Sequence, residues 1–240
     1  MFTRKPSLSP DKLKLIDFAF EKMHAKSFID LGGVWGVEAG YTFYALQKYP
    51  IQSAFLVDNE YTDKTIKESK KHKNLKTIQG NFGDPKIANQ LGKVDVTFLF
   101  DVLLHQVNPD WKEIIEMYAT KTVNFLVFNP QWVKGNRTVR LLDLGKEEYL
   151  RNVVTNVPFH ENSPSYQHLF DDLDAINPQS GKKWRDLSYV WQWGITDEDL
   201  IDKMKELGFK MHYHLNCGPF SKDPNLFVNF ENHAFAFKRN

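Results

Sequence analysis

Residues 27–41 read Ser-Phe-Ile-Asp-Leu-Gly-Gly-Val-Trp-Gly-Val-Glu-Ala-Gly-Tyr, and the rest of the chain can be arranged around this stretch. Its first five residues form a short apolar run that is typical of a buried parallel strand. Gly32, Gly33 and Gly36 then allow a sharp turn and a close approach of a ligand to the backbone. A helical pattern follows over residues 37–48. This order is typical of the first unit of a nucleotide- or nucleoside-binding α/β domain, although glycines at such a turn can also be purely conformational.

The composition is that of a globular protein with a hydrophobic core. Of 240 residues, 42% are hydrophobic and 25% are charged, so we expect one domain over residues 1–240 with an insertion, rather than two domains. The formal charge of +1 provides no field that would attract nucleic acid or an anionic membrane. No apolar stretch approaches the roughly 18 to 20 residues that span a bilayer, and the N-terminus lacks the apolar core of a signal peptide. Cys217, the single cysteine, excludes an internal disulfide framework. We therefore expect a cytoplasmic protein without nucleic-acid or membrane partners, of undetermined oligomeric state.

Strands and helices alternate along the first half of the chain. A helix is expected over residues 11–25, and the apolar run at residues 94–100 is typical of a central strand covered on both faces. After a helix over residues 197–207, two strands follow without a helix between them, so they must pair antiparallel or lie at an edge. The pattern predicts a parallel, doubly wound α/β sheet. The other expected strands are residues 53–57, 76–79, 122–128, 209–215 and 233–238.

The alternation breaks over residues 129–194, which are rich in Pro, Asn and Ser. A loop-rich insertion of this length is usually a lid or a binding element rather than scaffold. Its aromatic side chains could stack on an aromatic or cationic ligand, or they could form a local hydrophobic core that holds the insertion on the sheet. The sequence leaves both interpretations open. The aromatic residues concerned are Trp132, Tyr166, Trp184, Tyr189, Trp191 and Trp193.

Four motifs occur in an order and spacing that resemble a known family. Asp30-Leu-Gly-Gly-Val-Trp-Gly36 follows the start of the first strand, Asp58 ends the second, Asn81-Phe82 follows the third, and residues 95–105 form the fourth strand and its exit. Together they resemble the class I S-adenosylmethionine-dependent methyltransferases, over residues 27–128 by motif and as far as Lys238 by strand order. The resemblance implies a seven-stranded, mostly parallel sheet whose last strand is antiparallel. It also implies S-adenosyl-L-methionine as cofactor and S-adenosyl-L-homocysteine as product.

The resemblance assigns roles to residues at the carboxyl ends of the strands, where the ligands of such sheets lie. Asp58 would hold the ribose hydroxyls, and Asn81 and Phe82 would lie at the adenine. Asp30 would pair with the ammonium group of the ligand or simply hold the turn. Val34 departs from the glycine pattern of the family's loop. The expected cofactor-binding residues are Asp30, Gly32, Gly33, Gly36, Asp58, Asn59, Asn81, Phe82, Asp101 and Leu103.

The glycine turn also bears on a competing class of nucleotide. A dinucleotide site needs bare glycine amides and a helix N-terminus facing a pyrophosphate, whereas S-adenosylmethionine carries no phosphate. The side chains of Val34 and Trp35 would crowd a pyrophosphate. Asp58 lies 22 residues after Gly36, a distance that suits a ribose-binding carboxylate in either class. An NAD(P)-linked oxidoreductase and a non-catalytic S-adenosylmethionine or S-adenosylhomocysteine binder are therefore alternatives to a methyltransferase.

Residues after the fourth and fifth strands are candidates for the site of a small-molecule methyl acceptor. His105 is expected to act as a general base or an acceptor-orienting group, or else to cap the turn before the next helix. Methyl transfer is an in-line displacement, so a base is needed only when the acceptor keeps its proton. No group of histidines has the spacing of an established metal site, and we expect no metal. The expected substrate-binding residues are Asn129, Trp132, Tyr166 and Trp191, in an insertion over residues 129–194 that roofs the acceptor pocket.

Overall fold

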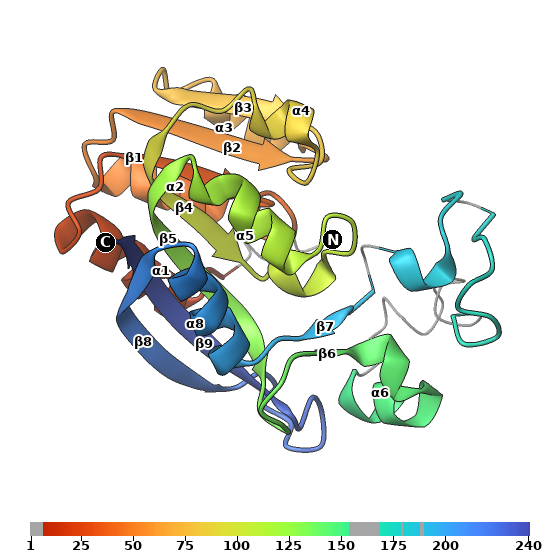
Figure 1. Cartoon of the computed structure of the whole chain (residues 1–240). Coiled ribbons are helices and arrows are strands. Elements are labelled where there is room, and N and C mark those ends of the chain that lie inside the picture. The colour runs from red at the N-terminus through yellow and green to blue at the C-terminus, as the bar shows by residue number, and fades with distance from the viewer. Residues whose placement is uncertain (1–6, 154–168, 179, 188–189) are drawn as a thin grey trace.

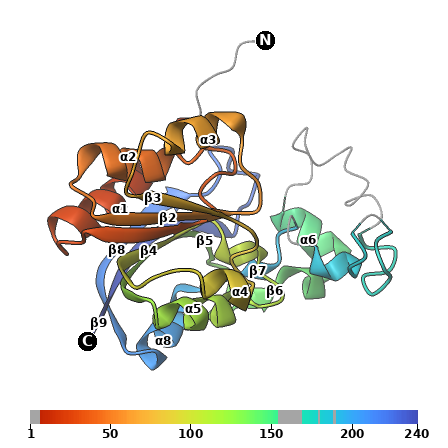
Figure 2. The same ribbon diagram turned by 90° about the horizontal axis from the view of Figure 1, so that it is seen from above.

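The structure is a computed structural model that describes residues 7–153, 169–178, 180–187 and 190–240 (Figure 1). Strands and helices alternate to give one large sheet with helices on both faces. The described residues between the fifth strand and the last helix, 133–153, 169–178, 180–187 and 190–194, form a side lobe beyond one end of the sheet (Figure 2). No helix in the described ranges is long and apolar enough to cross a lipid bilayer.

The large sheet has seven strands in the order β3-β2-β1-β4-β5-β9-β8. The first five strands are parallel, and β9 runs antiparallel to both of its neighbours. The expected doubly wound sheet with an antiparallel last strand is therefore confirmed. The order reverses between β1 and β4, and ligands of such sheets bind at the carboxyl ends of the strands beside this point. The strands are β1 (Ser27–Leu31), β2 (Ser53–Asp58), β3 (Leu75–Gln79), β4 (Val94–Phe100), β5 (Thr122–Trp132), β8 (Phe209–Pro219) and β9 (Phe230–Arg239).

Alternate side chains of the central strands bury themselves on opposite faces of the sheet. Phe28 and Phe98 stack on one face with ring centroids 4.9 Å apart, where α1 and α2 pack. Ile29 and Leu99 point to the other face and join the core formed with α5 and α8. Full burial of such a side chain contributes about 1.5 to 3 kcal/mol, so both faces hold the central strands firmly. The helices of the two layers are α1 (Pro10–Glu21), α2 (Gly40–Lys48), α3 (Asp63–Ser69), α4 (Pro85–Ala88), α5 (Trp111–Ala119) and α8 (Asp197–Glu206).

The fifth strand is longer than the expected residues 122–128. It continues to Trp132 because β9 pairs with it along its length, up to the pair Trp132↔Phe230. Both strands of the final hairpin are longer than expected for the same reason. Asn129 and Trp132 therefore belong to the sheet, and the excursion from the sheet begins at Val133 rather than at Asn129.

Two helices are shorter than the hydrophobic pattern predicts. α2 begins at Gly40 rather than at Val37, because Glu38 and Ala39 adopt left-handed backbone conformations with φ of 54° and 57°. The chain therefore makes an extended turn between β1 and α2 before the helix can start. α1 likewise ends at Glu21 rather than at residue 25, and the chain then turns into β1.

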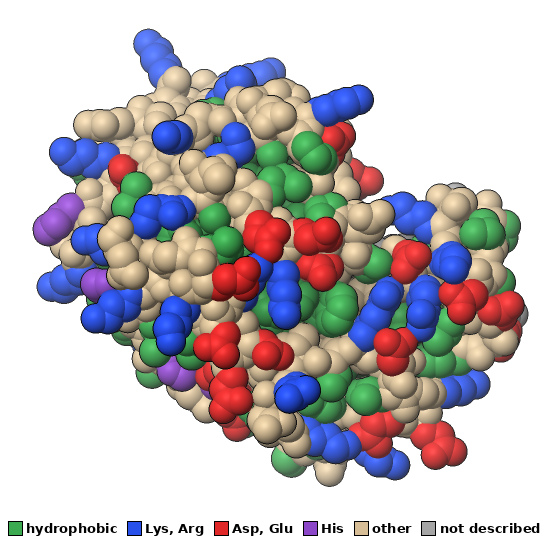
Figure 3. Space-filling view, in the orientation of Figure 1, with side chains coloured by type: hydrophobic (Ala, Val, Ile, Leu, Met, Phe, Trp, Pro, Cys, Tyr) green, Lys and Arg blue, Asp and Glu red, His purple; other side chains and the backbone are tan. Residues whose placement is uncertain are grey.

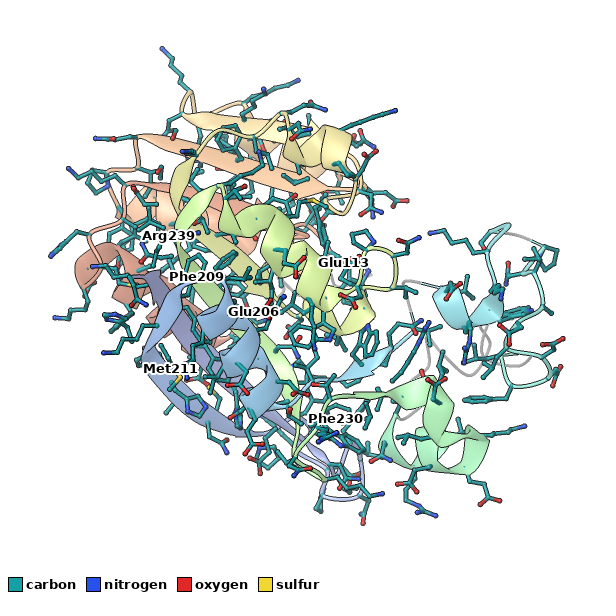
Figure 4. The ribbon with its side chains drawn as sticks, viewed as in Figure 1. Glu113, Glu206, Phe209, Met211, Phe230 and Arg239 are labelled. Atoms are coloured by element: carbon teal, nitrogen blue, oxygen red, sulfur yellow. The ribbon has the colours of Figure 1, made fainter. Side chains whose placement is uncertain are left out.

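The side lobe has its own hydrophobic cluster, which includes Trp132, Tyr149 and Phe230. Phe230 lies at the start of β9, at the end of the sheet that faces the lobe (Figure 4). Its ring contacts Trp132 at 5.2 Å and Trp191 at 5.1 Å between centroids. The cluster therefore packs the lobe against the end of the β5–β9 strand pair. The described elements of the lobe are β6 (Val139–Arg140), η2 (Leu141–Leu144), α6 (Lys146–Asn152), η3 (Trp184–Asp186) and β7 (Trp193–Gly194).

Candidate functional site

The glycine turn after β1 is tightly packed, and two of its glycines are required by close contacts. At Gly32, with φ of 71°, an added Cβ would lie 2.8 Å from a methyl carbon of Val102. At Gly33 an added Cβ would collide with the carboxylate of Asp30. Gly36 has φ of 72°, a conformation that favours glycine, and open space around it. The turn therefore lies directly against the chain that leaves β4.

Asp58 ends β2 and holds the glycine turn from the other side. Its Oδ2 accepts a hydrogen bond of 2.9 Å from the amide of Val34, while its Oδ1 receives only a long contact of 3.4 Å from the amide of Glu60. The carboxylate is buried. Asn59, the next residue, is exposed and uses its carbonyl oxygen to accept a bond from Gln79. The structure thus brings the acidic end of β2 and the glycine turn together, as the spacing predicted.

Asn81 and Phe82 follow β3 on the same edge of the sheet. The side-chain oxygen of Asn81 accepts a hydrogen bond of 2.8 Å from the amide of Gly83. Phe82 is buried, and its ring lies 3.5 Å from the position of a Cβ added at Gly32. The hydroxyl of Tyr118 donates to the Phe82 carbonyl at 2.8 Å and fixes the loop to α5. An aromatic ring therefore lies beside the turn, where the sequence predicted the adenine.

Asp30 is the most deeply buried acid of this region. The hydroxyl of Thr42 donates a hydrogen bond of 2.5 Å to its Oδ2. Burial raises the pKa of the Asp30 carboxyl to about 6, an effect that the Thr42 bond and the nearby Lys12 partly offset. A buried anion of raised pKa is stabilised by any cation that binds next to it.

Lys12 of α1 reaches the end of β4 and was not predicted as a site residue. Its ammonium forms an ion pair with Oδ2 of Asp101 and lies 5.3 Å, 5.9 Å and 4.9 Å from the ring centroids of Tyr41, Phe100 and Phe128. Asp101 has a left-handed backbone with φ of 56°, and its buried Oδ1 has no hydrogen-bond partner among the described residues. The sequence signal was present, because Lys12 lies one helical turn before Ile16 on the apolar face of α1.

The 3₁₀ turn η1 (Leu103–His105) connects the end of β4 to the side lobe. The ring Nδ1 of His105 lies 3.2 Å from the carbonyl oxygen of Val190, and the Leu104 carbonyl accepts a bond of 3.0 Å from the Gln192 amide. A carbonyl can only accept, so Nδ1 carries the proton in the neutral ring and Nε2 carries the lone pair. Leu103, predicted to line the cofactor site, is buried in the core on the α5 face.

The described residues predicted to bind substrate lie in different parts of the molecule. Asn129 and Trp132 are buried in β5, and Oδ1 of Asn129 has no hydrogen-bond partner among the described residues. The ring of Trp191 packs 5.1 Å from Phe220 and 5.1 Å from Phe230, which favours the local-core interpretation of the lobe's aromatic residues. Tyr166 and Tyr189 lie outside the described residues.

Comparisons with known proteins identify the fold. No family model and no curated protein matches the sequence. The N-terminal domain of EvdMO1, crystallised in the presence of SAH and D-fucose, matches with a TM-score of 0.55 at 11% identity, over 98% of this chain and 85% of that one. The methyltransferase domain of bacterial CtHen1-CN matches with a TM-score of 0.55 at 14% identity, over 97% and 100% of the two chains. The chain has the class I methyltransferase fold.

A third solved structure of this fold contains both a small molecule and S-adenosylhomocysteine. It is the Burkholderia thailandensis 1,6-didemethyltoxoflavin-N1-methyltransferase with bound 1,6-didemethyltoxoflavin and S-adenosylhomocysteine, with a TM-score of 0.55 at 7% identity over 96% and 79% of the chains. At such identities the likeness concerns the course of the backbone. The side chains around the glycine turn must therefore be judged by their own chemistry.

In the methyltransferase fold of this chain, the described side chains form two polar groups on either side of the glycine turn. Asp58 lies on the β2 side, and Lys12 with Asp101 lies on the β4 side, with Asp30 buried between α2 and the turn. Asp58, which can accept hydrogen bonds from hydroxyl groups, thus lies on the other side of the turn from the oppositely charged pair Lys12 and Asp101. This arrangement can bind a ligand with hydroxyls at one end and a zwitterion at the other.

Proposed function

We propose that the chain binds S-adenosylmethionine and transfers its methyl group to a small molecule. The observation that carries this proposal is the pairing of Lys12 with Asp101 across the glycine turn from Asp58. The α-amino-acid end of the cofactor is a zwitterion, so its carboxylate would bind the Lys12 ammonium and its ammonium would bind Asp101 or Asp30. The ribose hydroxyls would bind Asp58, and the adenine would lie near Phe82.

The same charges disfavour a dinucleotide. Asp30, Asp58 and Asp101 surround the turn, and three carboxylates would repel a pyrophosphate. α2 begins only at Gly40, after an extended turn, so the turn lacks the helix N-terminus that pyrophosphate sites use. A sulfonium cation is instead favoured by neighbouring carboxylates and aromatic rings.

Bound S-adenosylmethionine would supply a methyl group activated by a positively charged sulfur. In the transfer, a lone pair of the acceptor would form the new bond to this carbon as the carbon–sulfur bond breaks with its electron pair going to sulfur, and the acceptor would lose its proton. The protein's share of the work is to align donor and acceptor and to exclude water. We assign His105 as the general base for an acceptor that does not lose its proton unaided. Its Nε2 would take the proton, while the Val190 carbonyl holds the ring at Nδ1.

The side lobe is proposed to form one wall of the acceptor pocket. It lies beyond the carboxyl ends of the parallel strands, and its residues Val190 and Gln192 bond to η1 (Figure 1). On the face shown in Figure 3, a notch separates the body of the molecule from the lobe, and positive and negative side chains are interspersed around it. The structures of EvdMO1 and of the toxoflavin enzyme were solved with D-fucose and 1,6-didemethyltoxoflavin, which supports a small-molecule acceptor.

Replacing Asp58 with alanine is expected to weaken S-adenosylhomocysteine binding by about 1.5 to 3 kcal/mol, the contribution of hydrogen bonds to a charged group. Isothermal calorimetry on the full chain measures this change. Asp58→Asn keeps an acceptor for the Val34 amide and should lose less affinity for S-adenosylhomocysteine than Asp58→Ala. Glu60→Ala removes an exposed neighbouring charge and should bind S-adenosylhomocysteine as the wild type does. NAD⁺ should leave the melting temperature unchanged. A wild-type chain that binds NAD⁺ but not S-adenosylhomocysteine would refute the proposed function.

Replacing Lys12 with methionine is expected to weaken binding of the amino-acid end of the cofactor and to leave binding of its nucleoside end unchanged. Affinity for S-adenosylhomocysteine should fall by about 1.5 to 3 kcal/mol, because its carboxylate loses a charged partner. Methylthioadenosine lacks the amino-acid end, so its affinity should stay the same. Lys14→Met, on the exposed face of α1, is the matched control. Equal losses for both ligands would show that Lys12 supports the fold of the site rather than the carboxylate.

A further inference from the structure

Two histidines and an aspartate converge at the edge of the sheet remote from the glycine turn. Asp197 is the first residue of α8, His214 lies on β8 and His233 lies on β9. Oδ2 of Asp197 lies 2.7 Å from Nδ1 of His233 and 3.3 Å from Nε2 of His214, and the two ring nitrogens are 3.2 Å apart. Three potential ligand atoms from three elements thus form a triangle with sides of 2.7 Å, 3.2 Å and 3.3 Å.

We propose that Asp197, His214 and His233 bind a divalent transition-metal ion of the zinc type. Zinc lies at about 2.0 to 2.2 Å from imidazole nitrogen and carboxylate oxygen, so neighbouring ligand atoms of a tetrahedral zinc site are about 3.3 to 3.6 Å apart. The two distances to His214, 3.2 Å and 3.3 Å, are close to that spacing, and the Asp197–His233 contact of 2.7 Å would lengthen by about 0.6 Å when the ion binds. Two imidazoles and one carboxylate also form a donor set that zinc and similar ions prefer to magnesium or calcium.

Hydrogen bonding alone leaves this cluster incompletely satisfied. Oδ1 of Asp197 is buried without a hydrogen-bond partner among the described residues, and the His233 side chain, whose Nε2 has only a long contact to Glu231, is 8% exposed. An ion bound to the three facing atoms would use the lone pairs of both rings and the carboxylate charge at once. The unpartnered Oδ1 of Asp197 lies on the same carboxylate and could bind the ion or a water attached to it.

Neighbouring side chains hold the two rings in the orientation that such a site needs. The ring of His214 stacks on Phe235, with centroids 4.6 Å apart and planes 8° apart. Oε2 of Glu231 lies 3.5 Å from Nε2 of His233, on the side of the ring away from the triangle, and Glu231 is itself bonded to Asn216. A carboxylate behind a ligating histidine is the usual outer partner at metal sites, because it fixes the tautomer.

The location predicts a structural role. The site joins the N-terminus of α8 to β8 and β9, and β8 is an edge strand. Because His214 is 32% exposed on its side chain, an ion could enter from solvent. An ion that binds the folded chain and not the unfolded one raises the free energy of unfolding, so the metal is expected to stabilise this edge. The sequence did not reveal the site, because its ligands come from three separate elements.

The test uses the full chain, freed of any affinity tag and dialysed against a chelator. Adding ZnCl₂ is expected to raise the melting temperature and to leave one equivalent of bound zinc by elemental analysis. CoCl₂ should give the visible absorption of nitrogen- and oxygen-ligated cobalt. MgCl₂ at the same concentration should change nothing. A wild-type chain that retains no zinc and shows no shift in melting temperature would overturn the proposal.

Variants then locate the ion. Changing a residue behind a metal ligand typically lowers metal affinity by about 10- to 100-fold. His214→Gln and Asp197→Asn change ligands themselves, so each should lower zinc affinity by more than this. His212→Gln removes an exposed histidine two residues from His214 on the same strand, and it should bind zinc as the wild type does. Equal loss in the His212 variant would place the ion elsewhere and reject the assignment. These measurements need no S-adenosylmethionine, so their outcome is independent of the proposed methyltransferase activity.

Discussion

Replacing Asp30 with asparagine is expected to stabilise the ligand-free chain at pH 7 by about 3 kcal/mol. Burial raises the pKa of Asp30 from 3.8 to about 6, and each pKa unit corresponds to about 1.36 kcal/mol. The folded chain holds this proton to higher pH than the unfolded chain does. Its stability therefore falls as pH rises from about 4 to about 6, and above pH 6 the full penalty of the buried anion remains. Asparagine carries no charge and can still accept the hydrogen bond from Thr42.

Urea unfolding of both chains between pH 4 and pH 7 measures this difference. The two free energies of unfolding should agree near pH 4 and should separate in favour of Asp30→Asn as pH rises. Thr42→Val removes a bond that lowers the pKa of Asp30, so this variant should lose stability more steeply over the same range. If the free energies of unfolding of Asp30→Asn and the wild type change in parallel with pH, burial does not raise the pKa of the Asp30 carboxyl.

The same substitution should act in the opposite direction on the ligand. If the cation of the cofactor binds next to Asp30, S-adenosylhomocysteine stabilises the ionised carboxylate, and Asp30→Asn loses that interaction. The wild type should therefore show the larger rise in melting temperature on ligand addition, although it is the less stable chain without ligand. Such a reversal is the mark of an acid retained for binding rather than for folding.

Local sequence patterns were sufficient for the parallel half of the sheet. β4 has the predicted bounds, and β1, β2 and β3 agree to within a residue, because a short apolar run between turn residues defines a buried parallel strand. The final hairpin was predicted too short. The lengths of β5, β8 and β9 depend on pairing between strands far apart in sequence, up to Asn124↔Lys238, and this pairing leaves little trace in local hydrophobicity.

The candidate site divides in the same way. The glycine turn, Asp58 and Phe82 could be found because each follows a strand, and strand ends meet at one edge of a parallel sheet. Lys12 lies on the apolar face of α1, which marks it as unusual, but its role could not be assigned because its partner Asp101 is 89 residues away in the sequence. Asp197, His214 and His233 were missed for the same reason. Residues on one element are visible in a sequence, whereas clusters from several elements require the fold.

Replacing His105 with alanine is expected to lower kcat by about 10²- to 10⁴-fold with an acceptor that keeps its proton, the usual contribution of a general base. An acceptor is first found by screening with released homocysteine as the readout. Affinity for S-adenosylhomocysteine should not change, because Nδ1 of the ring is held by the Val190 carbonyl of the side lobe. Added imidazole should restore part of the activity of the variant, because it can accept the proton in the space that the side chain leaves.

A positioning role for His105 makes a different set of predictions. The His105 ring holds the Val190 carbonyl and meets Trp191 edge to face at 6.4 Å, so its loss could simply displace the lobe. In that case His105→Ala and Trp191→Ala should both raise KM for the acceptor, and imidazole should have no effect. Under the base assignment Trp191→Ala raises KM alone, while His105→Ala lowers kcat at unchanged KM. The split between KM and kcat in these two variants therefore distinguishes a group that moves the proton from one that only places the lobe.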